Sequence, residues 1–111
     1  MMTDDAPLEI DVEALHKMRE DGTAHTLLDV REPQELDICS VSDSLNIRMM
    51  DVPESLEKLP KDNPLVVMCH SGMRSMQVTQ WLRMNGYENA QNLAGGIDAW
   101  AAAFDPDMQR Y

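Results

Sequence analysis

Short apolar runs alternate with helix-like segments along nearly the whole chain, and this alternation constrains the fold more than any other feature. The apolar runs at 25–30 and 65–68 predict buried strands, and the short segments 8–11, 44–47 and 90–93 predict further strands. The segments with a helical pattern or helix-boundary residues are 11–22, 32–38, 52–60, 75–85 and 96–104. Strands that alternate with helices across short turns favour a parallel sheet covered by helices on both faces. The sequence therefore predicts an α/β fold.

Several of these helices carry local boundary signals. Asp11 is a candidate N-cap for the first helix, and Gly22 is a candidate stop. Pro33 lies where the first turn of a helix accepts proline. In the last helix, apolar residues recur at the helical i, i+3, i+4, i+7 spacing, namely Ile97, Trp100, Ala101 and Phe104. These signals predict amphipathic helices that pack against the sheet.

The length and the charge limit the classes of protein to which the chain can belong. Its 111 residues suffice for one domain, 1–111, with a core over about residues 8–104 and a C-terminal tail at 105–111. The formal charge of −11, from 20 acidic and 9 basic residues, repels phosphate backbones and argues against nucleic-acid binding. The same charge favours a basic protein partner over a small anion.

The composition also bears on compartment and cofactors. The chain has no apolar run of about 18 residues, so we expect no membrane span. The acidic N-terminus lacks the pattern of a signal peptide. The two cysteines, Cys39 and Cys69, form no zinc or redox motif, and the three histidines show no metal-ligand spacing. We therefore expect reduced thiols, a cytoplasmic protein, no metal and no cofactor.

The stretch "LVVMCHSGMRS" at residues 65–75 carries the most specific chemical pattern. Cys69 ends an apolar run and precedes a helix, whose N-terminus presents free N–H groups and the positive end of its dipole. Gly72 permits a tight loop in which successive N–H groups converge on the sulfur. Arg74 adds a permanent positive charge, and Ser75 is a candidate helix cap. The pattern predicts a nucleophilic thiolate in an anion cradle.

Plainer interpretations exist for both cysteines and for the neighbouring histidine. A cysteine after an apolar strand is more often a small buried hydrophobe than a nucleophile. The C-x-x-G-x-R context favours the nucleophile for Cys69, whereas nothing basic or glycine-rich surrounds Cys39, which we interpret as structural. His70 is interpreted as a plain cradle residue, with proton handling as the alternative.

Three ordered segments of the chain resemble the family of rhodanese-like domains. They are "LLDVREPQEL", "LVVMCHSGMRS" and "GYENAQNLAGGIDAW". The first is similar to a strand of that family and the acidic start of the helix that follows it. The second is similar to the family's active-site loop, and the third to its closing segment, which contains a double glycine. The resemblance spans roughly residues 8–104. It implies a five-stranded, mostly parallel sheet with helices on both faces, which agrees with the alternation described above.

The resemblance implies that the protein is a single-domain sulfurtransferase. The cysteine that matches Cys69 accepts a sulfane sulfur from a donor such as thiosulfate and passes it, through a persulfide, to a thiophilic acceptor such as cyanide or a thiol. Arg74 is the second implied catalytic residue and stabilises the thiolate and the persulfide. The implied substrate-binding cradle consists of His70, Ser71, Gly72, Met73 and Ser75.

Two further matches are expected to support the site. Asp29 and Arg31 match the family's D-x-R at the end of its second strand, which implies an ion pair or hydrogen-bond network around the loop. Gly95 and Gly96 imply a turn before the last helix.

One segment departs from the family's pattern. In the stretch Cys39–Ser44 the histidine, proline and glycine of a "GHIPGA"-like segment are replaced by Ser40, Ser42 and Asp43. The conformation of this stretch, and any substrate contact it makes, are left open by the sequence.

Two other functions stay open. A phosphatase or arsenate reductase of the same fold also uses a cysteine and an arginine. The loop from Cys69 to Arg74 has six residues, which is shorter than the phosphatase type, and it contains no acidic residue to act as general acid. A persulfide carrier or protein-binding module without independent turnover is the other alternative, and the acidic surface favours its docking to a basic partner.

Overall fold

Five strands form a single sheet in which every neighbouring pair is parallel. The computed structural model describes residues 7–111. The elements in chain order are β1 (Glu9–Ile10), α1 (Val12–Asp21), β2 (Thr26–Asp29), α2 (Pro33–Leu36), β3 (Leu45–Asn46), the 3₁₀ helices η1 (Met49–Glu54) and η2 (Leu56–Lys58), β4 (Leu65–Met68), α3 (Met73–Met84), β5 (Ala90–Leu93) and α4 (Gly96–Phe104). The spatial order of the strands is β1-β5-β4-β2-β3. The predicted α/β fold is confirmed, with a sheet that is wholly rather than mostly parallel.

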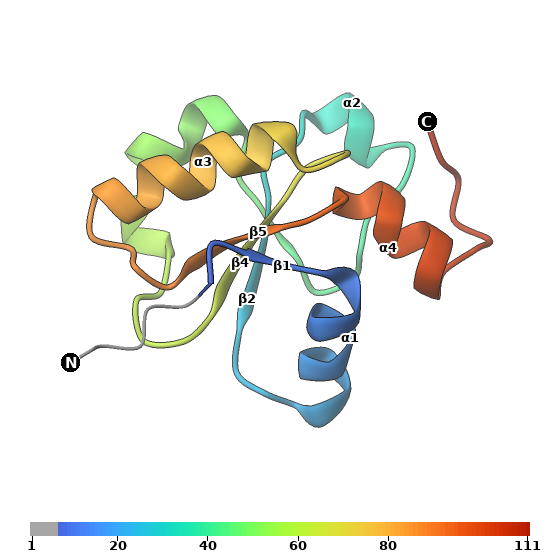
Figure 1. The fold of residues 1–111 in the computed structure, drawn as a ribbon. Helices are drawn as coiled ribbons and strands as arrows, with labels where there is room; N and C mark the ends of the chain where they lie inside the picture. The colour runs from blue at the N-terminus through green and yellow to red at the C-terminus, as the bar shows by residue number, and fades with distance from the viewer. Residues whose placement is uncertain (1–6) are drawn as a thin grey trace.

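Helices cover both faces of the sheet (Figure 1). α2 and α3 lie on one side together with the 3₁₀ helices, and α1 and α4 lie on the other. Leu27 and Val66 belong to the hydrophobic cluster beneath α1 and α4, whereas their neighbours Leu28 and Val67 belong to the cluster beneath α3. Because successive strand residues face opposite sides and both sides are covered, β4 is apolar at every position.

The predicted boundaries of α1 are confirmed. The carboxylate of Asp11 accepts a hydrogen bond from the N–H of Ala14 at 2.9 Å. Gly22, with φ 73, follows the helix in the left-handed conformation that commonly ends helices.

Two other helical segments differ from the prediction. α3 begins at Met73, two residues before the expected start, because Gly72 is its N-cap. The segment 52–60 contains the end of η1 and all of η2, which are 3₁₀ rather than α-helical, and Pro53 inside η1 has no N–H for an α-helical hydrogen bond. None of the helices described within residues 7–111 is long and apolar enough to cross a membrane.

The carboxyl edge of the sheet gathers the segments that the sequence singles out. β4 ends at Met68, directly before Cys69, and β2 ends at Asp29. Asp29 lies opposite Met68 in the strand register, and the N–H of Val30 donates to the carbonyl of Met68 at 3.0 Å. Ligand sites of open parallel sheets lie beyond this edge. The strand order therefore brings the D-x-R segment next to the cysteine loop.

Candidate active site

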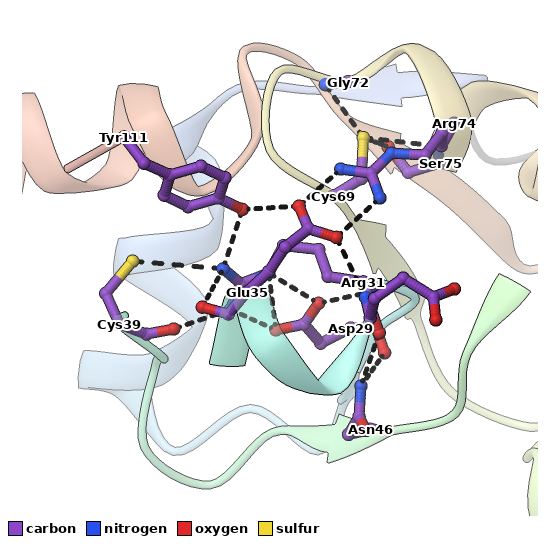
Figure 2. Close-up of polar contacts among 11 residues, drawn as sticks. Asp29, Arg31, Glu35, Cys39, Asn46, Cys69, Gly72, Arg74, Ser75 and Tyr111 are labelled. Carbon is purple, nitrogen blue, oxygen red and sulfur yellow. Dashed lines mark hydrogen bonds and ion pairs between the residues drawn. The ribbon is translucent and has the colours of Figure 1, made fainter. Parts of the chain in front are cut away.

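The sulfur of Cys69 lies among hydrogen-bond donors at the start of α3 (Figure 2). Cys69 is only 1% exposed. Its Sγ accepts hydrogen bonds from the N–H of Gly72 at 3.1 Å, and from the N–H and the hydroxyl of Ser75 at 3.4 and 3.3 Å. Donors that converge on one point stabilise negative charge at that point. The loop thus has the geometry of a cradle for a thiolate.

Gly72 allows the loop to turn back toward its own sulfur. Its φ of 108 lies in a region that residues with side chains rarely adopt. A Cβ at this position would lie 3.3 Å from the nitrogen of Gly95 and 3.4 Å from the carbonyl oxygen of Leu93. Both the backbone angle and the crowding by the segment between β5 and α4 therefore favour glycine here.

The N-terminus of α4 holds the outer side of the loop. The carbonyl of Cys69 accepts a hydrogen bond from the N–H of Ile97 at 2.9 Å, and the carbonyl of His70 accepts one from Asp98 at 3.1 Å. These bonds use N–H groups that the first turn of a helix otherwise leaves unpaired. Because these two carbonyls are turned toward α4, the N–H groups of the loop are left to face the sulfur. The Gly95–Gly96 turn thus places the residues that support the outer side of the cysteine loop.

The cradle favours ionisation of the thiol. Burial alone would raise the pKa of Cys69, but hydrogen bonds from the Ser75 hydroxyl and from three loop N–H groups outweigh burial and lower this pKa below its ordinary value. A larger fraction of Cys69 is therefore the reactive thiolate at neutral pH than for an ordinary cysteine.

Replacing Ser75 with alanine removes the hydroxyl donor and keeps the backbone N–H. We expect the pH dependence of Cys69 alkylation by iodoacetamide to shift to higher pH. The lost hydrogen bond stabilises the thiolate more than the neutral thiol, so its removal raises the pKa of Cys69. The measurement is the alkylation rate across the range in which thiols titrate. Thr79→Val is the matched control, since the Thr79 hydroxyl is equally buried but donates to the carbonyl of Ser75 at 2.7 Å. An unchanged midpoint in Ser75→Ala would show that the hydroxyl does not stabilise the thiolate.

Ser75 is not the helix cap that the sequence suggested. Gly72 is the N-cap of α3, so Ser75 lies inside the first turn and its side chain is free to face inward. Its single hydroxyl hydrogen is shared between the Cys69 sulfur and the side-chain oxygen of Asn92 on β5, which is the nearer acceptor. Asn92 also donates to the carbonyl of Gly72 at 3.2 Å. Sequence reasoning missed Asn92, because the burial of its amide within β5 is seen only in the fold.

Arg74 is paired with an acidic residue of α2. Its two terminal nitrogens donate to the two carboxylate oxygens of Glu35, each at 2.8 Å. This bidentate contact, working against burial, lowers the pKa of Glu35 to about 2. Glu35 is therefore ionised at neutral pH and serves as the counter-ion of Arg74 rather than as a general acid. The sequence did not single out Glu35, because 39 residues separate it from Arg74.

Asp29 and Arg31 form an ion pair whose side chains are both 0% exposed. The Nε of Arg31 donates to Asp29 Oδ1 at 2.9 Å, and its NH2 donates to Oδ2 at 2.8 Å. Burial alone would lower the pKa of Arg31, but the hydrogen bonds to Asp29 raise it instead. Arg31 also donates to the carbonyl of Cys39 at 2.9 Å, and the Asn46 amide donates to the carbonyl of Asp29 at 2.9 Å. The pair thus connects β2 with the segments around Cys39 and β3.

Tyr111, in the segment interpreted as a tail, reaches the same cluster. Its hydroxyl donates to Oε1 of Glu35 at 2.8 Å and accepts from NH1 of Arg31 at 3.0 Å. Its ring packs edge-on against His70, with centroids 4.2 Å apart and an interplanar angle of 67°. Figure 2 shows Tyr111 beside Glu35, on the side of that carboxylate away from Ser75. Nothing in the local sequence "DPDMQRY" indicates this contact.

The remaining predicted cradle residues differ in their surroundings. Ser71 is exposed, and its N–H contributes to the lowered pKa of Cys69. Met73 is the first residue of α3 and is 77% exposed. The buried Nδ1 of His70 has no hydrogen-bond partner within residues 7–111.

The stretch Cys39–Ser44 forms its turn without the family's usual residues. Asp43 has φ 58 and is the only non-glycine residue with positive φ in the described part of the chain. Aspartate tolerates this conformation better than most residues do. The Ser44 hydroxyl donates to the carbonyl of Val41 at 2.8 Å, and the Cys39 sulfur lies 3.9 Å from NH1 of Arg31. The stretch therefore adjoins the buried ion pair through Cys39.

Known proteins share this architecture. The family model described as Rhodanese-like domain matches residues 11–103. A sulfurtransferase from Allochromatium vinosum is 39% identical over 93 residues, covering 84% of this chain and 87% of that protein. The thiosulfate sulfurtransferase GlpE from Vibrio cholerae is 32% identical over 96 residues, covering 86% and 90%. The structure of the human single-domain sulfurtransferase TSTD1 matches with a TM-score of 0.79 at 27% identity, covering 88% of this chain and 98% of that one.

The matching segment also occurs within longer proteins. The chain is 37% identical over 102 residues to the adenylyltransferase and sulfurtransferase MOCS3-2 from Zea mays, a match that covers 86% of this chain but only 21% of that protein. The family model, by contrast, spans most of this chain, and the Allochromatium protein is matched over most of both lengths. From its motifs, its five-stranded parallel sheet and these relatives, we conclude that the chain belongs to the rhodanese-like domain family, whose members include the sulfurtransferases named above.

Proposed function

We propose that the protein transfers sulfane sulfur through a persulfide on Cys69, with thiosulfate as a donor. In the first half-reaction the thiolate attacks the outer sulfur of thiosulfate. A bond forms between Sγ and that sulfur while the S–S bond of thiosulfate breaks, and sulfite leaves with the electron pair. In the second half-reaction cyanide or a thiolate attacks the outer sulfur of the persulfide. Thiocyanate or a new persulfide is released, and Cys69 leaves as the thiolate.

The observation that carries this proposal is the set of donors around the Cys69 sulfur. Three donors lie within 3.4 Å of Sγ, and two of them are backbone N–H groups that cannot move independently of the loop. Such fixed donors stabilise the thiolate before the reaction and the returning thiolate after it, without reorganisation. The loop N–H groups of His70, Ser71 and Met73 complete the proposed cradle for the outer sulfur.

Arg74 has the proposed role of holding an anionic donor at the mouth of the cradle. Its side chain is 37% exposed and its guanidinium carries five N–H groups. Two of them donate to Glu35, and no other hydrogen bond of Arg74 is formed within residues 7–111. The remaining N–H groups are available to the oxygens of a donor such as thiosulfate.

Intact-protein mass spectrometry after incubation with thiosulfate tests the mechanism. We expect the wild-type protein to gain the mass of one sulfur atom and to lose it when cyanide is added. Cys69→Ser should gain nothing, whereas Cys39→Ser should load like the wild type. Loading of Cys69→Ser, or loss of loading in Cys39→Ser alone, would contradict the assignment of the carrier cysteine.

The same experiment distinguishes the alternatives. A protein that alkylates readily at Cys69 but takes up no sulfur would be tested next for phosphate and arsenate chemistry. A protein that loads but discharges only to another protein would be a persulfide carrier. Discharge to cyanide with multiple turnovers supports the enzyme.

The net charge predicts a salt effect on loading. Because the chain carries a formal charge of −11 and thiosulfate is a dianion, salt should screen the repulsion and raise the second-order loading rate severalfold. Stopped-flow loading at low and high ionic strength measures this rate. Alkylation of Cys69 by neutral iodoacetamide is the control and should not respond to salt. A loading rate that is flat or falls with salt would contradict repulsive steering.

We further propose a basic protein as the physiological acceptor and the cytoplasm as the compartment. The acidic surface that slows thiosulfate would speed encounter with a basic partner, and that rate should fall as salt is added. Both cysteines are unpaired thiols, which fits a reducing compartment.

A further inference from the structure

Glu35 forms hydrogen bonds with groups from three directions. Oε2 accepts from Arg74 and from the backbone N–H of Glu32, at 2.8 and 2.9 Å. Oε1 accepts from Arg74 and from the hydroxyl of Tyr111, both at 2.8 Å. The negative charge of Glu35 is therefore shared between Arg74 and two other donors, the Glu32 N–H and the Tyr111 hydroxyl. Of these two donors, only the hydroxyl can be removed by a conservative side-chain substitution.

The phenol of Tyr111 is held in place on its other sides. NH1 of Arg31 donates to its oxygen at 3.0 Å, so the hydroxyl hydrogen is directed to Glu35. The edge-on contact with His70 fixes the ring over a residue of the cysteine loop. Tyr111 is 42% exposed, and its partial burial raises the pKa of the phenol, which therefore keeps its proton and remains a donor at neutral pH. Tyr111 thus links the buried Asp29–Arg31 pair to the Glu35–Arg74 pair (Figure 2).

We propose that Tyr111 is a positioning residue for sulfur transfer. Its hydroxyl donates a hydrogen bond that offsets part of the negative charge of Glu35. Glu35 then neutralises less of the positive charge of Arg74, which remains able to bind an anionic sulfur donor. Without the hydroxyl, Arg74 is the only side-chain donor to Oε1 among residues 7–111. The carboxylate then offsets more of the guanidinium charge, and the mouth of the cradle becomes less attractive to anions. The sulfur itself keeps its three donors, so its reactivity toward neutral reagents is unaffected. This inference rests on the proposed function in one respect, namely that the anion bound at Arg74 is a sulfur donor.

The test compares two alkylating agents that differ in charge. Iodoacetate is an anion and iodoacetamide is neutral, and both attack the Cys69 thiolate. For Tyr111→Phe we expect the ratio of the iodoacetate rate to the iodoacetamide rate to fall roughly threefold, while the iodoacetamide rate is unchanged. Phenylalanine keeps the ring contact with His70, so this variant isolates the hydroxyl. With thiosulfate as substrate, the same variant should raise KM by a similar factor and retain kcat.

Two variants complete the design. Glu35→Gln removes the negative charge itself and should raise the rate ratio. Gln109→Ala changes an exposed residue of the same segment and should leave the ratio as in the wild type. An unchanged ratio in Tyr111→Phe overturns the proposal, whatever Glu35→Gln does. So does an equal loss of both rates, which would indicate a purely structural role.

The alkylation ratio needs no sulfur donor, so it separates this inference from the proposed function. If thiosulfate proves not to be a substrate, the ratio still decides whether Tyr111 governs anion access to Cys69. If thiosulfate loads Cys69 but the ratio does not change in Tyr111→Phe, the proposed function stands and the role of Tyr111 is rejected.

Discussion

Replacing Asp29 with alanine is expected to lower the free energy of unfolding by about 3–5 kcal/mol. The reason is that the substitution removes the carboxylate partner of Arg31. The side chain of Arg31 is 0% exposed, and its Nε and NH2 both donate to Asp29. A buried guanidinium without its carboxylate keeps its charge, because its pKa is far above any working pH. The penalty of burying that charge is then uncompensated. Urea unfolding monitored by tryptophan fluorescence measures the loss.

Asp51→Ala is the matched control for this prediction. Asp51 also pairs with an arginine, Arg48, at 2.9 Å, but both side chains of that pair are more than 40% exposed. Exposed pairs contribute about 0–1 kcal/mol, so the control should unfold almost like the wild type. A loss below about 1 kcal/mol for Asp29→Ala would mean that the D-x-R pair does not hold this edge of the sheet together. It would also remove the predicted role of Asp29 and Arg31 in supporting the loop.

Replacing Gly96 with alanine is expected to lower the free energy of unfolding by about 2–4 kcal/mol and to slow alkylation of Cys69 at neutral pH. A Cβ on Gly96 would lie 2.5 Å from the carbonyl oxygens of both Cys69 and His70. These are backbone atoms of the cysteine loop, so the loop itself must move. Displacing it weakens the bonds to Ile97 and Asp98 and tilts the N–H groups away from the sulfur. The pKa of Cys69 should then rise toward its ordinary value.

Gly22→Ala separates the effect of the clash from that of the backbone angle. Gly22 has φ 73, close to the φ of 60 at Gly96, but a Cβ there would meet nothing within 4 Å. The control should therefore lose only about 1 kcal/mol and leave the alkylation rate unchanged. Equal losses for the two variants would show that the loop accommodates the extra carbon. Chemical denaturation and iodoacetamide rates on the same samples provide both readouts.

The sequence predicted those features that local residues determine. The apolar run of β4 and the cap at Asp11 depend on neighbours within a few positions, and both are found where they were expected. The cysteine cradle is also local, since Cys69 and Ser75 lie only six positions apart. The pattern along the chain already gave five strand segments, and the family resemblance agreed with that number.

The features that the sequence did not predict depend on contacts between distant segments. Glu35 meets Arg74 across 39 positions, and Tyr111 meets Arg31 across 80. Neither contact has a local pattern, because each arises only after the parallel strand order has brought the loops to one edge. The Gly95–Gly96 turn was recognised as a turn, but its contact with the cysteine loop depends on β5 lying beside β4.

The hydrogen bonds from Ile97 and Asp98 to the cysteine loop also fix the order in which the loop and its support arise during biosynthesis. A ribosome makes Cys69 well before these two residues, and chains are synthesised from the N-terminus. Until α4 has emerged and docked, the carbonyls of Cys69 and His70 have no partners from that helix and the loop lacks its outer support. A nascent or prematurely terminated chain therefore lacks the two hydrogen bonds that hold the outer side of the cysteine loop.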